Sequence, residues 1–391
     1  MKRVITKLID IATRVVEWDK SHDIYNNGID NLYPDRVERY IDNSITAKMS
    51  SKQMLFNIIG SSFEGVSNIV VHSKTNLKLF DFLSDFASSI VDHKGVFVHV
   101  KFNLNYNIKE MKVLPFKSCR IGLKDSNDYN GKIIFSKDWS AKKLETNAID
   151  VFNLNKNVIK AQIEKAGGFE KYKGQIYYYN FERKTVYPTS RIDAVLNDCD
   201  SEAQSSIYKN KLLRRGFFGK TIFMTRPLMD KTIPETIIDP KNNNRKIANP
   251  EYAQMETEAN NFRKNIEGFL GAENADGAIH VEADFDGEKM DEFFKIENIE
   301  SKINPALFLN VETSLRENIL MAYNNLPAGL VKSENSLFSK SAESLKEMKL
   351  QYWENNSNDR QIFLREANFL IQNFEGLDGI LTVKSVINES N

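Results

Sequence analysis

Apolar side chains recur along the first two hundred residues at spacings that predict both helices and strands. Spacings of three and four predict helices over residues 34–59 and 76–90. Alternating or continuous apolar positions predict four strands, over residues 95–102, 108–114, 119–123 and 132–135. The aromatic run 175–181, followed by 185–187, is typical of a hairpin. We therefore expect this part of the chain to form a mixed α+β domain.

Beyond residue 200 the pattern changes to helices separated by short strands and polar stretches. Ser201 and Gln204 form a capping box, which predicts a helix that begins there and ends near Gly216. Short strands are expected from Phe218, and a polar loop over residues 227–249.

Two Asn-Pro pairs mark the starts of further helices, because asparagine favours the N-cap and proline the first turn. The pair at 249–250 predicts a helix as far as residue 270, and the pair at 304–305 predicts one whose apolar stripe reaches Leu326. Between them, residues 278–284 alternate apolar and polar side chains, as a half-buried strand does.

The last part of the chain is predicted to be mainly helical. Residues 332–341 form a polar loop, after which 342–374 predict a long helix in two halves, split at 355–359. The second half places four apolar side chains on one face, at Phe363, Ala367, Leu370 and Phe374. Residues 379–387 have the pattern of a short strand.

The first sixteen residues are amphipathic. One helical face carries apolar side chains at Val4, Ile5, Leu8, Ile9, Ala12, Val15 and Val16. Asp10 and Arg14 interrupt the stretch where a signal peptide needs an unbroken apolar core, so we expect an amphipathic helix that stays on the mature protein. No stretch approaches the roughly 18 consecutive apolar residues of a membrane span, and no membrane partner is expected.

The composition narrows the class of protein. The 391 residues carry 53 basic and 53 acidic side chains, so the formal net charge is zero, which argues against a protein that coats a polyanion. An apolar content of 41% is enough to bury real cores, and the length suggests two to three domains. The two cysteines, Cys119 and Cys199, cannot build a disulfide framework or a four-ligand zinc site, and they fit a reducing compartment.

No group of residues has the spacing that catalysis, a metal or a cofactor requires. The segment Gly219-Lys220-Thr221 matches the end of a phosphate-binding P-loop, but Arg214 stands where that loop needs its first glycine. The histidines lack the i, i+4 spacing of a metal site; they are His22, His72, His93, His99 and His280. We therefore expect no catalytic residue, no metal and no cofactor, and a protein that is not an enzyme.

Charge is segregated within the neutral total. Residues 203–226 contain six basic side chains and no acid, whereas residues 273–300 contain ten acids against Lys289 and Lys295. One interpretation is two solvated faces. The other is that the basic segment of one copy meets the acidic segment of the next, which puts Arg214 and Arg215 at an interface between copies.

The order of these pieces resembles the portal proteins of tailed double-stranded DNA bacteriophages over nearly the whole chain. The segments that carry the resemblance are the helix, strand and LPFKSCRIG run of 84–122, DSEAQSSIYKNKLLRRGFFGKTIFM at 200–224, SLRENILMAYNNLPAGLV at 314–331, and SAESLKEMKLQYWENNSNDRQIFLREANFLIQNF at 341–374. The most specific part is a helix ending in Asn-Leu-Pro, then a polar loop and a long kinked helix. It resembles a portal stem helix, tunnel loop and wing-spanning helix. The high frequency of asparagine resembles that of proteins from the crAss-like phages of the gut.

The resemblance implies an α+β fold with a portal-like wing domain of helices and mixed or antiparallel strands, two stem helices flanking a small α/β clip, and a long kinked helix near the C-terminus. The implied parts are the wing (1–200), the first stem helix (201–217), the clip (218–303), the second stem helix (304–331), the tunnel loop (332–341), the wing-spanning kinked helix (342–374), and a short crown or truncated tail (375–391).

The resemblance also implies a function. Family members are assembled in the host cytoplasm into a homo-oligomeric ring, usually a dodecamer, at one capsid vertex of the virion, where DNA passes through the centre during packaging and ejection. The implied partners are further copies of the chain, non-specifically contacted double-stranded DNA, the major capsid protein, the terminase motor and the head–tail adaptor. The implied DNA-channel loop residues are Lys332, Ser333, Asn335, Ser336 and Lys340. The interface between copies is expected to contain Arg214, Arg215, Val311, Leu315 and Ile319.

Two other interpretations stay open. One is a different virion structural protein, such as a capsid or head–tail adaptor subunit, which would form shells, tubes or small adaptors. The other is a nucleotide-using packaging enzyme built on Gly219-Lys220-Thr221. A closed ring with a central pore distinguishes a portal from both.

Overall fold

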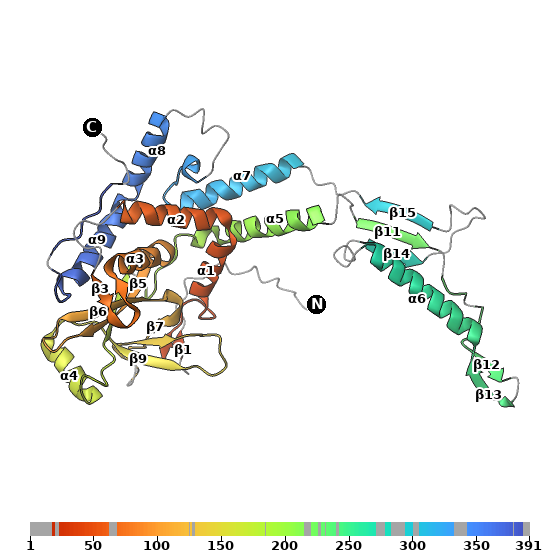
Figure 1. The fold of residues 1–391 in the computed structure, drawn as a ribbon, viewed down its shortest axis with the longest axis horizontal. Helices are drawn as coiled ribbons and strands as arrows, with labels where there is room; N and C mark the ends of the chain where they lie inside the picture. Colours follow the sequence, from red (N-terminus) through yellow and green to blue (C-terminus); the bar gives the residue numbers. More distant parts are fainter. Residues whose placement is uncertain are drawn as a thin grey trace, which may run out of the picture. The chain divides into compact units, whose positions relative to one another are not determined.

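The structure is a computed structural model (Figure 1). It describes residues 18–19, 23–61, 69–124, 126, 130–183, 185–214, 220–225, 228–230, 232–239, 242–270, 278–282, 294–299, 305–331, 342–377 and 379–385. The chain divides into two compact units. The first unit comprises Met1–Ala203 together with Val311–Asn391, and the second unit comprises Gln204–Asn310.

A six-stranded sheet forms one layer of the first unit, in the order β6-β5-β10-β9-β8-β7. The strands are β5 (Gly95–Phe102), β6 (Ile108–Leu114), β7 (Cys119–Ile121), β8 (Lys132–Ser136), β9 (Thr146–Val151) and β10 (Gln175–Asn180). Neighbouring strands are antiparallel, except that β9 and β10 are parallel and are joined through helix α4 (Lys156–Ala166). The four strands predicted between residues 95 and 135 are confirmed.

Helices α1 (Tyr33–Asn43), α2 (Ile45–Ile59) and α3 (Leu79–His93) pack together, and α3 packs against the sheet strands β5 and β6. The single helix expected over residues 34–59 breaks at Ser44. The Ser44 backbone is extended, and its hydroxyl accepts a hydrogen bond from the Ala47 amide at 3.0 Å, so Ser44 caps α2 instead of continuing α1.

Residues from both ends of the chain share the core of the first unit. Helices α8 (Ala342–Asn355) and α9 (Ser357–Gln372) meet at Asn356, inside the predicted split. The apolar face expected on the second half is buried, and Phe363 lies 6.0 Å, between ring centroids, from Phe86 of α3. Leu377 and Leu381, beyond α9, are buried in the same core.

Short elements complete the first unit. They are β1 (Trp18–Asp19), β2 (Ile24–Tyr25), β3 (Val70–His72), β4 (Leu77–Lys78) and the 3-10 helices η1 (Ser73–Thr75), η2 (Phe116–Ser118), η3 (Asp193–Val195) and η6 (Ala328–Leu330). Strand β1 pairs with β2, and β3 with β4.

The second unit contains a three-stranded sheet, a two-stranded hairpin and one helix. The sheet has the order β14-β11-β15, and the hairpin pairs β12 with β13. The bounds are β11 (Lys220–Thr225), β12 (Thr236–Asp239), β13 (Asn242–Ala248), α6 (Pro250–Leu270), β14 (Ala278–Glu282) and β15 (Phe294–Ile299). The Asn249 side chain accepts a hydrogen bond from the Glu251 amide at 3.1 Å, so the expected Asn-cap of α6 is confirmed.

Two helices connect the units along the chain. Helix α5 (Leu196–Arg214) leads from the first unit into the second, and α7 (Pro305–Ala322) leads back. Helix α5 begins five residues before Ser201, so the expected capping box lies inside the helix and is wrong as a start signal. Helix α7 ends at Ala322, four residues before the expected Leu326, in a turn where Asn324 and Asn325 have positive φ.

Three further expectations are wrong. Residues 185–187 form no second strand of a hairpin, because β5 and β9 already occupy both edges of β10; instead, the Asn180 side chain donates to the Thr185 carbonyl. The polar loop expected over 227–249 contains the β12–β13 hairpin. The strand expected over 379–387 does not form within its described part, 379–385. The mixed α+β class itself is confirmed.

Candidate functional site

Glu202 of α5 joins three helices in the first unit. Its carboxylate accepts hydrogen bonds from the Ser44 hydroxyl, from the Thr46 hydroxyl at 2.6 Å and from the Thr46 amide at 3.2 Å, and Arg316 of α7 lies 3.9 Å away. A carboxylate at a helix N-terminus pairs with amides that have no partner within the helix and complements the helix dipole. Glu202 therefore fixes α5 and α7 to the start of α2.

A buried polar network holds the other end of α7. The Asn324 side chain donates to Asn356 at 3.0 Å and to Asp359 at 2.9 Å, and Asp359 pairs with Arg191 at 3.3 Å. The Tyr352 hydroxyl donates to the Tyr323 carbonyl at 3.1 Å. These contacts hold the left-handed turn at Asn324 in place after the end of α7.

The surface of α7 differs along its length. Val311 is 49% exposed, Leu315 is half-buried, and Ile319 is fully buried in the core of its own chain. Ile319 therefore has no exposed surface with which to contact a second copy. Its expected place in an interface is corrected, because the first unit covers the C-terminal part of the apolar stripe of α7. Val311 and Leu315 stay candidates for an interface.

Several predicted site residues lie outside the described part of the structure. All five DNA-channel loop residues do so, namely Lys332, Ser333, Asn335, Ser336 and Lys340. Arg214 is the last residue of α5, but its side chain is not described, and Arg215 lies outside the described residues. The amphipathic helix expected over residues 1–16 also lies outside them, as does Asn304, the expected N-cap of α7.

The ends of the two charge-segregated segments are neighbours within one copy. Strand β11, at the end of the basic segment, pairs antiparallel with β15, at the end of the acidic one, and parallel with β14. Glu282 of β14 forms an ion pair of 2.6 Å with Arg263 of α6. Glu282 of the acidic segment is thus neutralised within its own chain.

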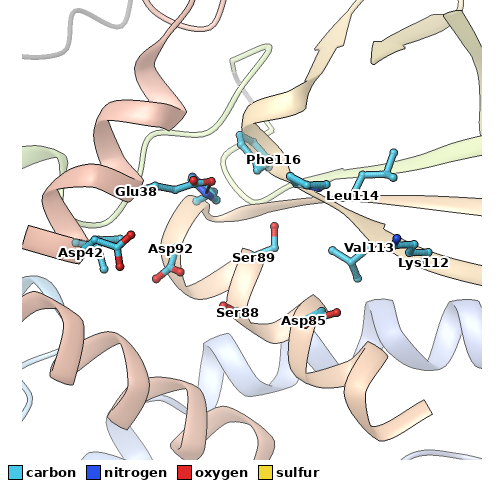
Figure 2. A pocket seen from close by; sticks show the side chains of 13 residues that line it. Glu38, Asp42, Asp85, Ser88, Ser89, Asp92, Lys112, Val113, Leu114 and Phe116 are labelled. Carbon is cyan, nitrogen blue, oxygen red and sulfur yellow. Dashed lines mark ion pairs between the residues drawn. The ribbon is translucent and has the colours of Figure 1, made fainter. Parts of the chain in front are cut away.

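A pocket of about 450 Å³ lies between α1, α3 and β6 (Figure 2). Four carboxylates line it, those of Glu38, Asp42, Asp85 and Asp92. Burial by itself raises the pKa of Glu38, but hydrogen bonds from His93 and from Lys117, whose Nζ lies 2.6 Å away, outweigh it and lower the pKa. Burial raises the pKa of Asp92, to which Ser51 donates at 2.6 Å.

These contacts give the pocket a structural role. Glu38 is paired with Lys117, and Asp92 accepts a hydrogen bond from Ser51, so contacts within the chain fix the positions of both carboxylates. His93 stacks on Phe116, with ring centroids 4.7 Å apart. We therefore assign the pocket to the packing of α1 and α3 on the sheet and derive no reaction from it.

The segment considered as a P-loop has the wrong local structure for phosphate binding. Lys220 and Thr221 begin β11 and pair with Ile299 and Asn298 of β15. A P-loop instead leads from a strand into a helix, whose first amides cradle the phosphates. Cys119 and Cys199 are buried, and burial raises the pKa of both thiols, which makes them inert packing residues.

Within the described residues, no three side chains of His, Cys, Asp or Glu gather to hold a metal ion. No helix among these residues has the length and apolar character to span a membrane.

No protein-family model matches the sequence, and no curated protein matches it either. A chain in the neck of an empty gene transfer agent particle is 10% identical, covers 89% of this chain and 84% of that chain, and has a TM-score of 0.47. A chain in the virion of the native gene transfer agent particle is 9% identical, with 90% and 84% covered and a TM-score of 0.48. An HK97-family phage portal protein from Corynebacterium diphtheriae is 8% identical, with 80% and 82% covered and a TM-score of 0.39.

Two of these structures are components of gene transfer agent particles, and the third is a phage portal protein. None of the three is described as a crAss-like phage protein, so that finer assignment stays a prediction. Likeness of this degree does not decide function.

Sequence reasoning missed the residues that position α5 and α7. Glu202, Arg191 and Asp359 are single charged residues in helical or irregular stretches, and no spacing rule distinguishes them from solvated charges. The pair Asn324-Asn325 carried a usable signal, because asparagine is among the few residues that adopt a left-handed conformation readily.

Proposed function

We propose that the chain is the subunit of a ring-shaped phage portal, a structural protein of the virion. The observation that carries the proposal is connectivity. One unit is built from Met1–Ala203 and Val311–Asn391, and a second compact unit is inserted between them. The chain enters the insertion along α5 and leaves it along α7. Two long helices that join a small α/β unit to a larger α+β unit fit the stem, clip and wing that the sequence resemblance implies.

Each proposed part of the portal subunit corresponds to particular helices and strands. The first unit is the wing, α5 and α7 are the stem helices, and β11 to β15 with α6 form the clip. Residues 332–341 are the tunnel loop, and α8 with α9 is the wing-spanning kinked helix. We assign the described part of the tail, 375–377 and 379–385, to the wing instead of to a crown, because Leu377 and Leu381 are buried in the wing core and the Ser61 amide donates to the Lys384 carbonyl at 3.1 Å.

Surface chemistry supports packing between copies. Ile207 of α5 is 49% exposed, and Val311 and Met321 of α7 are 49% and 63% exposed. Large apolar side chains that stay in water on the two connecting helices are expected where neighbouring subunits cover them. In a closed ring each copy contacts the next through two different faces.

The zero net charge of the chain supports a role as a channel for DNA. Contacts to six to ten phosphates dominate affinity for DNA, which then changes by about 10³ to 10⁵-fold with modest changes of salt concentration. A channel that made so many contacts would retain the DNA instead of letting it pass. A chain with zero net charge lets DNA slide through. We propose that the ring, usually of twelve copies in this family, occupies one capsid vertex, contacts the major capsid protein, and receives the terminase motor and then the head–tail adaptor at the clip.

Electron microscopy of the purified full-length protein tests the proposal. Negatively stained particles should be closed rings with a central pore, and native mass spectrometry should give one discrete copy number. Shells, open tubes or small adaptors would support a different virion protein and overturn the portal assignment. ATP hydrolysis that Lys220→Ala abolishes would support the packaging enzyme instead, whereas the strand position of Lys220 leads us to expect none.

A further inference from the structure

A second pocket of the first unit, of about 270 Å³, lies between the sheet and the C-terminal half of α4. Its walls come from β8, β9, α4 and the segment that leads into β10. Four of the lining residues are lysines, namely Lys132, Lys165, Lys171 and Lys173. Asp150 carries the only carboxylate among the lining residues, so four ammonium groups and one carboxylate give the pocket a formal net charge of +3.

The four pocket lysines have no counter-ion within their own chain. Elsewhere in the first unit lysines are paired with carboxylates, as Lys109 is with Glu375 at 2.7 Å. None of the four forms such a pair within the described part of the chain. Lys173 donates instead to the neutral side-chain oxygen of Asn147, at 3.2 Å. Because the four like charges repel one another, an anion that enters the pocket is attracted by all of them and relieves that repulsion.

Gln162 adds a neutral donor to the wall of the pocket. Its side-chain oxygen accepts two hydrogen bonds, from the Tyr172 hydroxyl at 2.9 Å and from the Gln175 side-chain amide at 2.7 Å. Burial raises the pKa of Tyr172, so its hydroxyl keeps its proton and stays a donor at neutral pH. Two donors on one oxygen fix the orientation of the Gln162 amide, whose Nε2 hydrogens have no partner within the described residues. They are available to bind an anion.

Two of the lysines also have a local role at the C-terminus of α4. Cations are stabilising there, because the last carbonyls of a helix carry partial negative charge. Lys165 lies in the last turn, and Lys171 comes close to the glycine cap that follows it. This role does not explain the other two lysines. Lys132 lies opposite Asp150 across the β8–β9 ladder without forming an ion pair, and Lys173 lies beyond the helix, just before β10.

We propose that the pocket between α4 and strands β8 and β9 binds a phosphate group, either of a nucleic-acid backbone or of free inorganic phosphate. Lysine ammonium groups bind phosphate as point charges, and donors from several elements can bond several of its oxygens. A water molecule takes about 30 Å³ of liquid, so the pocket has room for a phosphate group and several waters. The site lies within the first unit alone, so it needs no ring and is independent of the proposed function.

Calorimetric titration of the full-length protein with inorganic phosphate, at constant ionic strength in chloride, tests the site. Lys132→Gln combined with Lys173→Gln should weaken binding about tenfold or more, because two charge-assisted contacts are lost. The matched control is Lys142→Gln with Lys143→Gln, which removes the same charge from two exposed lysines that do not line the pocket. All four changes are at side chains that form no ion pair, so circular dichroism should stay unchanged. Equal losses in the two variants would mean a diffuse effect of charge and would overturn the proposal.

Gln162→Glu provides a test that leaves the lysines in place. The new carboxylate still accepts from Tyr172 and Gln175, but it removes the Nε2 donor and repels phosphate, so binding should be lost. Fluorescence anisotropy with a short labelled DNA duplex distinguishes the two sources of phosphate. DNA affinity that falls in the Lys132 and Lys173 variant but not in the control assigns the pocket to a nucleic-acid backbone. Unchanged DNA affinity with weakened binding of inorganic phosphate assigns it to free phosphate. Binding of neither probe, or binding that Gln162→Glu leaves unchanged, overturns the proposal.

Discussion

Arg191 and Asp359 form an ion pair of 3.3 Å inside the first unit, where their side chains are only 4% and 11% exposed. The Arg191 Nε also donates to the Val91 carbonyl at 2.7 Å, and Asp359 accepts from Asn324. The pair therefore ties the ends of α3 and α7 to the start of α9.

Removal of Asp359 should strongly destabilise the fold. Asp359→Ala leaves the Arg191 cation buried without its counter-ion, which typically costs about 3–5 kcal/mol of unfolding free energy. Urea denaturation measures the loss. The control is Asp42→Ala, which breaks the exposed pair with Lys48 and should cost no more than about 1 kcal/mol. Equal losses in the two variants would contradict a special role for the buried pair.

Glu38 should make the protein less stable in acid. Because its folded pKa is lowered, the unfolded chain binds the proton more readily. The stabilisation is fully present above the ordinary glutamate pKa of about 4.3 and is lost as the pH falls through the lower folded value. Urea titrations between about pH 3 and 7 should show a shallower loss of stability for Glu38→Gln than for the unchanged protein.

Asp92 lines the same pocket, but its ionisation should change the stability of the fold in the opposite direction to that of Glu38. Burial raises its folded pKa, so the folded state binds the proton more readily and the ionised carboxylate opposes folding at neutral pH. Asp92→Asn should therefore stabilise the protein at pH 7, by an amount that shrinks as the pH falls. A steady difference across the whole pH range would show that ionisation of Asp92 is not the cause.

Leu315→Asp should disrupt assembly without unfolding the chain. Leu315 is half-buried on α7, and a charge there would face the apolar contact that we propose between copies. Light scattering should give a smaller mass for this variant, with an unchanged circular dichroism spectrum. Asn318→Asp, an exposed change on the same helix, should assemble normally. A monomer before and after the change would count against the ring.

Charge reversal at the end of α5 should weaken assembly gradually. Arg214→Glu with Arg215→Glu removes attraction to acidic residues of the next copy, and each exposed pair contributes about 0 to 1 kcal/mol. Assembly should also weaken with added salt. The matched control reverses Lys142 and Lys143, two adjacent exposed lysines of the first unit. Assembly that ignores both salt and the Arg214 and Arg215 changes would mean that the segregated charges are solvated faces.

Deletion of residues 333–339 should separate assembly from genome retention. The flanking η6 and α8 pack against each other in the first unit, so shortening their connection leaves the fold in place. Rings should form, while particles built from them should lose or leak their DNA, because Lys332 and Lys340 no longer line the channel in the proposed position. Full-length genome retained in such particles would show that the loop is only a connection.

The sequence predicted elements best where the local pattern and the tertiary contacts agree. The strands between residues 95 and 135 formed as expected because their apolar positions face a core. The helix after Asn249 formed as expected because its cap is local. The break at Ser44 was missed because an apolar helical pattern runs through it, and only the cap hydrogen bond to Ala47 reveals the new helix.

The candidate site was less predictable, because its residues act over long separations in sequence. Glu202 contacts Thr46, and Arg191 contacts Asp359, across more than 150 residues in each case, and no window of sequence holds both partners. Ile319 was misassigned for the related reason that a helical stripe does not tell which of its residues the same chain covers. Only the three-dimensional core separates Ile319 from Val311.

The discontinuous first unit has a consequence for how the protein is made. When the ribosome has synthesised residues up to Ala203, Phe86 of α3 still lacks its partner Phe363, and about 140 residues, 204–341, must follow before α8 and α9. At roughly 5–20 residues per second this interval lasts on the order of ten seconds or more. During this interval the apolar surface of α2 and α3 that α9 later covers is exposed. Co-translational chaperone binding is therefore expected to be concentrated in this part of synthesis.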